Sequence, residues 1–382
     1  MRVAVVGGGI AGLTFAGRLA SLGLGCTVYE QEPTTAQGYG IQLAPNAVRL
    51  LRRAGVRELR AVVPERVRIR RWDDGRDLAT TPLGQACADR FGAPYLTLPR
   101  SELLAALHRT VARREEVQLR YGVRCVRVDA GSLYLADSSS VAADLVVGAD
   151  GLHSVVRTEL SPDEVRDSGI TVHRGLVRRR WTDTGPEGVP EVCVWLGPGR
   201  HLVAYPVDRD RYSFVAATVD PGEGLAEAYD GWDRQVRDLL AGAESVTRWE
   251  LRDRPPPRTW HTGSVTVIGD AAHAILPLGA HGANQAIESA AALAVTVAGS
   301  SRSSLTTNLH RYAGVRAERI GRVMELVRHN AADHHLADGP AQRDRDEGLR
   351  RRQSLATRTW LYGYDVEAVL SAALARPAVP AI

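Results

Sequence analysis

Three short segments, far apart in the chain, carry residue types that bind phosphates and sugar hydroxyls. They are Gly7-Gly8-Gly9-Ile10-Ala11-Gly12, Gly148-Ala149-Asp150-Gly151 and Gly269-Asp270-Ala271-Ala272-His273. Glycines permit tight turns and close approach of the backbone to a ligand, and carboxylates accept hydrogen bonds from sugar hydroxyls. The three segments predict a bound dinucleotide, but the first segment alone does not say which one.

The first segment fits the fingerprint of a dinucleotide-binding turn between a strand and a helix. Gly7 would permit the turn, Gly9 would let the backbone approach a pyrophosphate, and Gly12 would let the helix pack on the strand. The start of the helix, which includes Ala11, would offer free N–H groups to the phosphates. Glu30 follows at the end of the next predicted strand, where its carboxylate can accept both hydroxyls of a ribose. FAD and NAD both fit this pattern, whereas the 2′-phosphate of NADP does not.

The elements expected around these segments form an α/β unit. Met1 to Val6 and Cys26 to Glu30 are predicted strands, and Ile10 to Gly23 is a predicted helix between them. Asp144 to Ala149 and Val265 to Ile268 are short apolar runs, typical of strands that are buried on both faces of a parallel sheet. The second and third segments would therefore each follow such a strand.

Between residues 170 and 219 the pattern changes to β-rich stretches separated by Gly, Pro and Asp turns. This change predicts an antiparallel sheet and hence a second domain of different construction. We expect a discontinuous nucleotide-binding domain, a β-rich substrate domain and a C-terminal helical segment. Their expected ranges are 1–70, 97–165 and 260–300 for the first, 71–96 and 166–259 for the second, and 301–382 for the third.

The basic residues of this chain are all arginine, because none of the 48 lysine and arginine positions holds a lysine. Schiff-base chemistry and a phosphate-loop lysine are thereby excluded. The arginines are interleaved with acids and the net charge is only +4, so no nucleic-acid partner is expected.

Other functional classes are also disfavoured by the sequence. No run of eighteen apolar residues occurs, so a membrane partner is not expected. The four cysteines are widely spaced and lack metal-binding spacing, which predicts reduced thiols, no metal site and a cytoplasmic location.

The order of the three segments resembles the single-component (group A) FAD-dependent aromatic hydroxylases, typified by the 4-hydroxybenzoate and salicylate hydroxylases. Their second motif matches Gly148 to Arg157, and their third begins at Gly269 and continues to Glu288. Shorter matches extend the resemblance over nearly the whole chain. They are Gly38 to Asn46, Arg100 to Leu103, Tyr205-Pro206 and Trp360 to Asp365. The chain departs from the pattern at Ala280-His281, where Gly-Gln is frequent, and at Ser289, where an acid is usual.

The resemblance implies an α/β fold: a Rossmann-like FAD-binding domain of three-layer ββα architecture, a mostly antiparallel substrate sheet, and C-terminal helices. It implies FAD as resident cofactor, NADH or NADPH as transient reductant, and O₂ as co-substrate. A flavin C4a-hydroperoxide would then hydroxylate a phenolic or heteroaromatic small molecule. An epoxidase or oxidase of a natural-product intermediate, an NAD dehydrogenase, and a non-enzymatic binding protein of the same fold are the alternatives. The protein would be a monomer or a homodimer.

The resemblance also assigns the remaining cofactor contacts. Asp270 would accept a hydrogen bond from a ribityl hydroxyl, although an aspartate there could instead cap a helix. Asp150 would help to bind the cofactor, although Asp-Gly also forms turns. Arg100 would contact the cofactor from a position just before a helix that we expect to begin with Ser101 as its cap. The backbone amides of Gly282, Ala283 and Asn284, at the start of a long predicted helix, would face the flavin pyrimidine.

Two residues are candidates for catalysis. Tyr205 lies before Pro206 on the strand predicted from His201, where related enzymes have a functional tyrosine, and it would act as a base or polar relay for a phenolic proton. His281, beside the predicted helix start, could touch flavin or substrate. A packing role remains the alternative for both.

Overall fold

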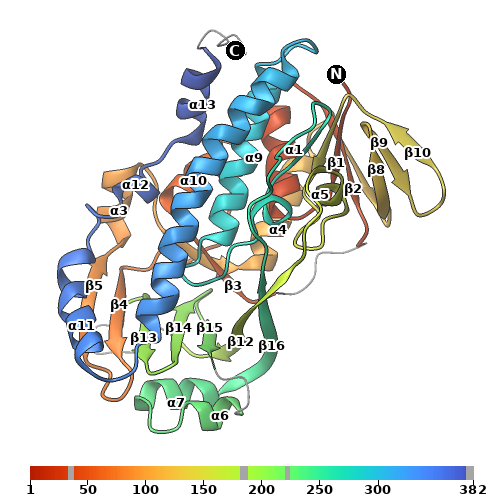
Figure 1. The fold of residues 1–382 in the computed structure, drawn as a ribbon. Helices are drawn as coiled ribbons and strands as arrows, with labels where there is room; N and C mark the ends of the chain where they lie inside the picture. The colour runs from red at the N-terminus through yellow and green to blue at the C-terminus, as the bar shows by residue number, and fades with distance from the viewer. Residues whose placement is uncertain (33–37, 181–187, 220–223, 376–382) are drawn as a thin grey trace.

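The computed structural model describes residues 1–32, 38–180, 188–219 and 224–375 of the 382-residue chain. Two large sheets dominate it, one in the upper half of Figure 1 and one in the lower half. The upper sheet is five-stranded and parallel, in the order β17-β11-β1-β2-β7. Its strands are β1 Val3–Val6, β2 Cys26–Glu30, β7 Val117–Tyr121, β11 Leu145–Gly148 and β17 Val265–Val267.

The strand order explains how three distant segments come together. The strands β17, β11 and β1 are neighbours, and each of the three glycine- and aspartate-containing segments follows one of them. Because the carboxyl ends of parallel strands meet at one edge of a sheet, the three segments lie side by side there.

Three layers make up this upper half, as expected. The parallel sheet lies between a group of helices and a small antiparallel sheet, which is seen at the right of Figure 1. The helices are α1 Ile10–Ser21, α4 Arg100–Ala112 and α9 Gly282–Ala298, and the small sheet is β8 Cys125–Asp129, β9 Ser132–Leu135 and β10 Ser140–Ala142. Small residues along α1 and α9 allow the two helices to pack closely in the main hydrophobic core. The α/β fold with a parallel FAD-type sheet is thereby confirmed.

The lower half is a seven-stranded, mostly antiparallel sheet in the order β16-β12-β15-β14-β13-β4-β5. Its strands are β4 Arg66–Arg71, β5 Asp77–Pro82, β12 Arg166–Arg178, β13 Glu191–Gly197, β14 Arg200–Pro206, β15 Arg211–Thr218 and β16 Ala243–Asp253. The short helices α6 (Leu225–Ala228) and α7 (Arg234–Ala241) cover its outer face. The sheet already includes all of β4, so we place the first boundary of the β-rich part before Arg66 rather than at residue 71.

Helix α10 (Leu305–His334) links the two halves. It runs beside α9 and continues down to the seven-stranded sheet, where Val323 and Val327 pack with Val172 and Ala217 of that sheet. The inner face of the sheet therefore looks toward α10 and the cofactor half. The last part of the expected C-terminal segment, 376–382, lies outside the described residues.

The remaining elements connect these parts or lie on their surface. They are β3 Gly40–Leu43, β6 Leu96–Pro99, α2 Pro45–Arg53, α3 Gly84–Phe91, α5 Val155–Leu160, α8 Asp270–His273, α11 Pro340–Arg352, α12 Thr359–Tyr362 and α13 Val366–Leu374. Strands β3 and β6 pair with each other. Helix α4 begins at Arg100 with Pro99 as its cap, so the expectation that Ser101 caps it is wrong. Among the described residues, no helix is long and apolar enough to cross a bilayer.

Candidate cofactor and substrate site

The three segments interlock through their glycines. A Cβ atom added to Gly7, which has φ +105°, would lie 2.3 Å from the carbonyl oxygen of Ala149 in the second segment. One added to Gly269, with φ +61°, would lie 2.7 Å from Cβ of Ala11 in the first segment. Only glycine permits these contacts. The three segments therefore form one continuous surface at the edge of the parallel sheet.

Two glycines of the first segment do different work. A Cβ on Gly12 would meet the carbonyl oxygen of Gly7 at 2.0 Å, whereas a Cβ on Gly9 would have no heavy atom within 4 Å. Helix α1 has Gly9 as its cap, with no side-chain cap and no acid in its first turn. The N–H groups of its first turn therefore have no side-chain acceptor, and no side chain of the turn blocks access to them. A pyrophosphate requires free N–H donors of this kind. The residues present fit FAD at this place.

Glu30 is oriented by the same segment. The Gly8 N–H donates to Glu30 Oε2 at 2.6 Å, and the Glu32 N–H donates to Glu30 Oε1 at 2.9 Å. Each carboxylate oxygen can accept a further hydrogen bond. The side chain lies at the end of β2, as expected for a group that accepts ribose hydroxyls.

Asp150 fixes the second segment from within. Its carboxylate accepts hydrogen bonds from Ser154 Oγ at 2.6 Å and from the Val155 N–H at 2.8 Å, at the start of α5. Burial raises the pKa of this carboxyl, and the hydrogen bonds oppose that rise. The Asp150 carboxylate therefore stabilises the turn before α5. A contact between Asp150 and the cofactor stays a proposal.

Arg157 connects the second segment to the third. The side chain is fully buried, pairs with Asp163, and donates to the carbonyl oxygens of Ala271 and Ala272 in α8. A buried arginine is tolerated when its donors are satisfied in this way. The position of Asp270, the first residue of α8, thus depends on a side chain of the second segment.

Asp270 and Arg100 lie close to each other. The cap of α8 is Gly269, and no side-chain cap is made, so Asp270 does not cap the helix. The Asp270 side chain is exposed, yet the surrounding protein raises its pKa while the Arg100 charge lowers it. Because the Asp270 side chain is exposed, its carboxylate could accept a hydrogen bond from a ribityl hydroxyl.

The start of α9 is held by Asn284. Its Oδ1 accepts from the Ala44 N–H at 2.8 Å, and its Nδ2 donates to the Gln42 and Ala280 carbonyl oxygens at 3.1 and 2.7 Å. These contacts occupy the amide, so any contact of Asn284 with the cofactor would use its backbone. Gly282 is half-buried, and a Cβ added to it would meet nothing within 4 Å.

Ala280 shows why the related pattern has glycine at its position. Its φ is +58°, in the left-handed region that side chains disfavour. The turn into α9 therefore carries backbone strain in this chain.

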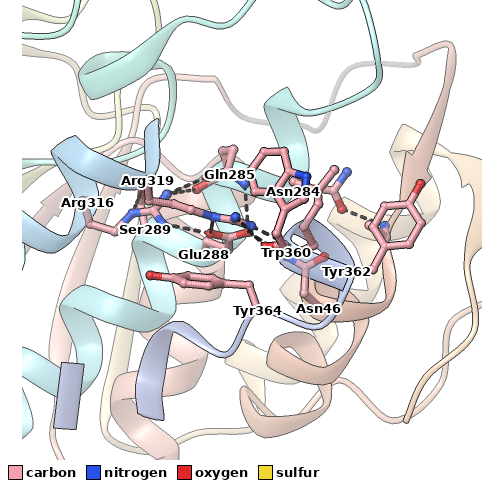
Figure 2. A network of polar contacts seen from close by, with 12 residues as sticks. Asn46, Asn284, Gln285, Glu288, Ser289, Arg316, Arg319, Trp360, Tyr362 and Tyr364 are labelled. Carbon is pink, nitrogen blue, oxygen red and sulfur yellow. Dashed lines mark hydrogen bonds and ion pairs between the residues drawn. The ribbon is translucent and has the colours of Figure 1, made fainter. Parts of the chain in front are cut away.

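Behind the start of α9 lies a buried ionic network that sequence reasoning missed (Figure 2). Glu288 of α9 accepts from Arg316 at 2.9 Å and from Arg319 at 3.0 Å, both on α10, and from Asn46 Nδ2 of α2 at 2.6 Å. Although burial alone would raise the pKa of Glu288, the two arginines hold it below its usual value. The one sequence signal was helical spacing: Arg316 and Arg319 share the buried stripe of α10.

Ser289, where an acid is usual, belongs to this network. Arg316 Nε donates to Ser289 Oγ at 3.1 Å, and Ser289 Oγ lies 2.7 Å from Nε2 of the buried His273. Burial lowers the pKa of His273 to about 3, so its imidazole is neutral. A neutral serine–histidine pair thus occupies the place of an acid.

The two catalytic candidates are both buried. The Tyr205 hydroxyl donates to the Gly40 carbonyl at 2.7 Å, and burial raises its pKa to about 12. Burial lowers the pKa of His281 to about 3, and nearby Arg358 and Arg319 lower it further. At neutral pH the phenol therefore stays protonated and the imidazole stays neutral, which argues against a direct proton acceptor at either residue.

Comparison with known proteins supplies the wider context. A family model described as an FAD binding domain matches residues 1–327. The chain is 40% identical to a 3-amino-4-hydroxybenzoate 2-monooxygenase of Streptomyces platensis, over 96% of this chain and 97% of that one. It is 30% identical to a 6-hydroxynicotinate 3-monooxygenase of Bordetella bronchiseptica, over 96% of each chain.

Solved structures agree with the fold. The substrate complex of a salicylate hydroxylase superposes with a TM-score of 0.81 at 24% identity, over 99% of each chain. Klebsiella pneumoniae HpxO, complexed with FAD and uric acid, gives a TM-score of 0.80 at 23% identity, over 98% of this chain and 96% of that chain. At these identities the likeness concerns the fold, which spans both sheets and the C-terminal helices.

Proposed function

This chain belongs to the FAD-binding family of group A aromatic hydroxylases, and on that premise we propose that it hydroxylates an aromatic carboxylic acid carrying amino or hydroxyl groups. It is an FAD-dependent monooxygenase that acts on aromatic compounds. The observation that carries the finer proposal is the 40% identity, over nearly the full length, to enzymes that hydroxylate 3-amino-4-hydroxybenzoate. That acid is therefore the first candidate substrate, and a hydroxynicotinate is the second because of the 30% relative.

Bound FAD would supply the transfer of two electrons to O₂ that delivers one oxygen atom to the ring. The chain's own residues would hold it. The open amides of α1 above Gly9 would bind the pyrophosphate, Glu30 the ribose, and Asp270 a ribityl hydroxyl. Arg100 would neutralise charge beside Asp270.

The start of α9 would stabilise negative charge on the reduced ring. The amides of Gly282, Ala283 and Asn284 form the first turn, at the positive end of the helix dipole. The Asn284 side chain holds this turn against β3. A fixed set of donors requires no rearrangement when the charge develops.

Proton handling would fall to a relay rather than to a side-chain base. Tyr205 can donate to Gly40 and accept from a neighbour, which suits a relay between substrate and solvent. His281 is neutral and buried, so we propose that it packs at the start of α9 and does not accept the proton.

The reductant, location and assembly are also proposals. We propose that NADH or NADPH binds only transiently, because the described residues contain one glycine-rich βαβ turn and FAD would occupy it. The cysteines at 26, 87, 125 and 193 are free, which supports a cytoplasmic location. A monomer or a homodimer remains our expectation.

The direct test is oxygenation of 3-amino-4-hydroxybenzoate by the purified FAD-loaded enzyme with NADH or NADPH under ¹⁸O₂. We expect the acid to stimulate oxidation of the reduced nicotinamide at least tenfold, and the product to carry one labelled oxygen on the ring. 6-Hydroxynicotinate tests the second candidate in the same assay. Benzoate, which lacks an electron-donating substituent, serves as the control that should not be hydroxylated.

The outcome of this assay separates the alternatives. If every aromatic acid yields only hydrogen peroxide, the proposed substrate class is wrong. Epoxidation of an olefin or dehydrogenation without labelled oxygen would favour the epoxidase or the oxidase instead.

A further inference from the structure

Arg174 lies on the inner face of the seven-stranded sheet. It is opposite Val215 of β15 and Thr247 of β16 in the strand register. Val172, two positions before it on β12, and Val215 both pack in the hydrophobic cluster that includes α10. The Arg174 side chain is therefore on the face that looks toward α10 and the cofactor half, and it is half-buried there.

No carboxylate pairs with this guanidinium among the described residues. Its Nε atom is buried and has no hydrogen-bond partner. The other buried arginines discussed above differ, because Arg157 pairs with Asp163, and Arg316 and Arg319 pair with Glu288. A buried N–H donor without a partner costs free energy, even on a half-buried side chain, unless a ligand accepts its hydrogen bond.

The guanidinium is held in place by an aromatic ring. The Arg174 Cζ atom lies 4.0 Å from the ring centroid of Tyr39, over the ring. Such stacking orients the planar group and leaves its N–H edges free to donate. The side chain is thus positioned before any ligand arrives.

Tyr39 connects this arginine to the cofactor site. The next residue, Gly40, accepts a hydrogen bond from Tyr205 and donates its N–H to Ser213 Oγ at 3.0 Å. The Tyr39 carbonyl oxygen accepts the Arg100 N–H at 3.0 Å, and Arg100 lies beside Asp270. Arg174 therefore contacts Tyr39, and Tyr39 in turn contacts Arg100, which would help to hold the cofactor.

The surface around Arg174 suits an aromatic ring. Leu176, Val203 and Val215 are apolar side chains on the same face of the sheet, and all three are half-buried. This surface contains one positive charge amid apolar groups. It complements a flat apolar molecule with one negative group at its edge.

We propose that Arg174 binds the carboxylate of the aromatic substrate through two parallel N–H···O hydrogen bonds, with Tyr39 fixing the plane of its guanidinium. This inference rests on the proposed function, because it names the residue that would recognise the acid. A planar guanidinium matches a carboxylate in this two-point geometry better than an ammonium does. Arg174 would thereby set which end of the ring faces the flavin.

The same guanidinium could instead receive a phosphate of NADH or NADPH, which is also an oxyanion. The two sources of the anion are distinguished by direct binding. Titration of the oxidised FAD-loaded enzyme, followed by the flavin absorbance, gives the Kd of 3-amino-4-hydroxybenzoate and of its carboxamide without turnover. Steady-state kinetics gives the KM of each reduced nicotinamide.

The variants are Arg174→Gln, Arg174→Lys and, as a control, Arg178→Gln on the same strand, where the arginine is exposed and pairs with Glu244. We expect Arg174→Gln to raise the Kd of the acid about 10- to 100-fold, in line with loss of hydrogen bonds to a charged group. The Kd of the carboxamide and the KM of the nicotinamide should change less than about threefold. Arg174→Lys should lie between, and Arg178→Gln should match the wild type.

Each other outcome contradicts the inference. An unchanged Kd for the acid with a raised nicotinamide KM would assign Arg174 to the reductant. If both Arg174 variants lose FAD or unfold, the residue is part of the cofactor scaffold instead. If the wild type binds the carboxamide as tightly as the acid, Arg174 does not recognise the carboxylate. Failure to hydroxylate an acid that binds tightly would instead count against the proposed function alone.

Discussion

Single residues at the edge of the parallel sheet show how one motif serves two purposes. Gly9 and Gly12 belong to the same glycine-rich segment, and the sequence assigned one to the ligand and the other to packing. The structure supports this division, because a Cβ on Gly9 would enter open space and a Cβ on Gly12 would collide with the Gly7 carbonyl. Substitution of each glycine should therefore fail in a different way.

We predict that Gly12→Ala destabilises the fold by roughly 3 kcal/mol, since its Cβ would force the helix away from the strand. Gly9→Ala should cost the apo fold less than about 1 kcal/mol, because the φ of −77° at Gly9 suits alanine. It should still weaken FAD binding at least tenfold, since the methyl group would occupy the place that we propose for the pyrophosphate. Urea unfolding of the apoprotein and FAD titration measure the two effects.

A control lies in the long helix. Gly321 of α10 has no heavy atom within 4 Å of an added Cβ, so Gly321→Ala should leave FAD binding unchanged and stabilise the helix by up to about 1 kcal/mol. Equal loss of stability in Gly9→Ala and Gly12→Ala would contradict the division of roles.

At the scale of elements, the buried network decides how the helices meet. Glu288 on α9 receives Arg316 and Arg319 from α10, and Arg319 also donates to the Trp360 carbonyl oxygen at 2.9 Å (Figure 2). The same Arg319 lies over the ring of Tyr364, 4.0 Å from its centroid. One carboxylate thus ties α9 to the long helix α10 and, through Arg319, to the C-terminal segment.

We predict that Glu288→Gln destabilises the protein by about 3–5 kcal/mol, because two buried arginines would lose their only carboxylate among the described residues. The substitution preserves shape, so the loss would reflect charge rather than packing. Urea unfolding of the FAD-free protein measures it. Glu347→Gln, in an exposed pair with Arg351, is the matched control and should change stability by less than about 0.5 kcal/mol. A change in the free energy of unfolding of less than about 1 kcal/mol in Glu288→Gln would contradict this prediction and would mean that water hydrates the two arginines in the variant.

At the scale of the whole molecule, neutral histidines lie beside α9 and at the C-terminal end of α10, where His273 is buried and His334 and His335 are half-buried. His273 contacts Ser289 near the cofactor half, while His334 and His335, at the other end of α10, contact His201 of the seven-stranded sheet. Burial lowers the pKa of His273 and His334 to about 3 and that of His335 to about 4. His334 and His335 thus connect α10 to the seven-stranded sheet without charge.

We predict that stability falls as the pH is lowered from about 6.5 toward 4. In this window the unfolded histidines, with an ordinary pKa of 6.5, take up protons that the buried ones refuse. Each of these histidines would lower the free energy of unfolding by roughly 1.4 kcal/mol for every pH unit within this window. The raised pKa values of Asp150 and Asp270 act in the opposite sense and offset part of the loss. Thermal unfolding at pH 7.5, 6.0 and 5.0 should show a steadily falling Tm.

His334→Asn removes one of these groups without touching the proposed cofactor contacts. The free energy of unfolding of this variant should fall less steeply with decreasing pH than that of the wild type, because one histidine no longer contributes to the slope. This expectation concerns the slope and holds whatever the stability of the variant at pH 7.5. An unchanged pH dependence in this variant would show that His334 takes up its proton in the folded state.

The sequence by itself determined the fold class and the binding of a dinucleotide, because these depend on local backbone requirements, and the resemblance of the three segments to a known family identified that dinucleotide as FAD. A turn that needs glycine at positions 7, 9 and 12, followed by a strand that ends in Glu30, can be identified without knowing what packs around it. The strand order β17-β11-β1, which brings the three segments together, was not predicted from the sequence and is seen only in the structure. The cap at Ser101 was wrong because a cap depends on one residue of register, which propensity does not resolve.

Only the tertiary structure decided which charged side chains have partners. Glu288 and Arg316 are distant in sequence, and their pairing arises where α9 packs on α10. Arg174 looked like any other arginine in a chain that has no lysine, and it stands out among the described residues because its buried Nε atom has no hydrogen-bond partner. The three glycine and aspartate segments specify the oxidant through local geometry. Recognition of the substrate depends on side chains from separate strands and turns, and packing alone brings those together.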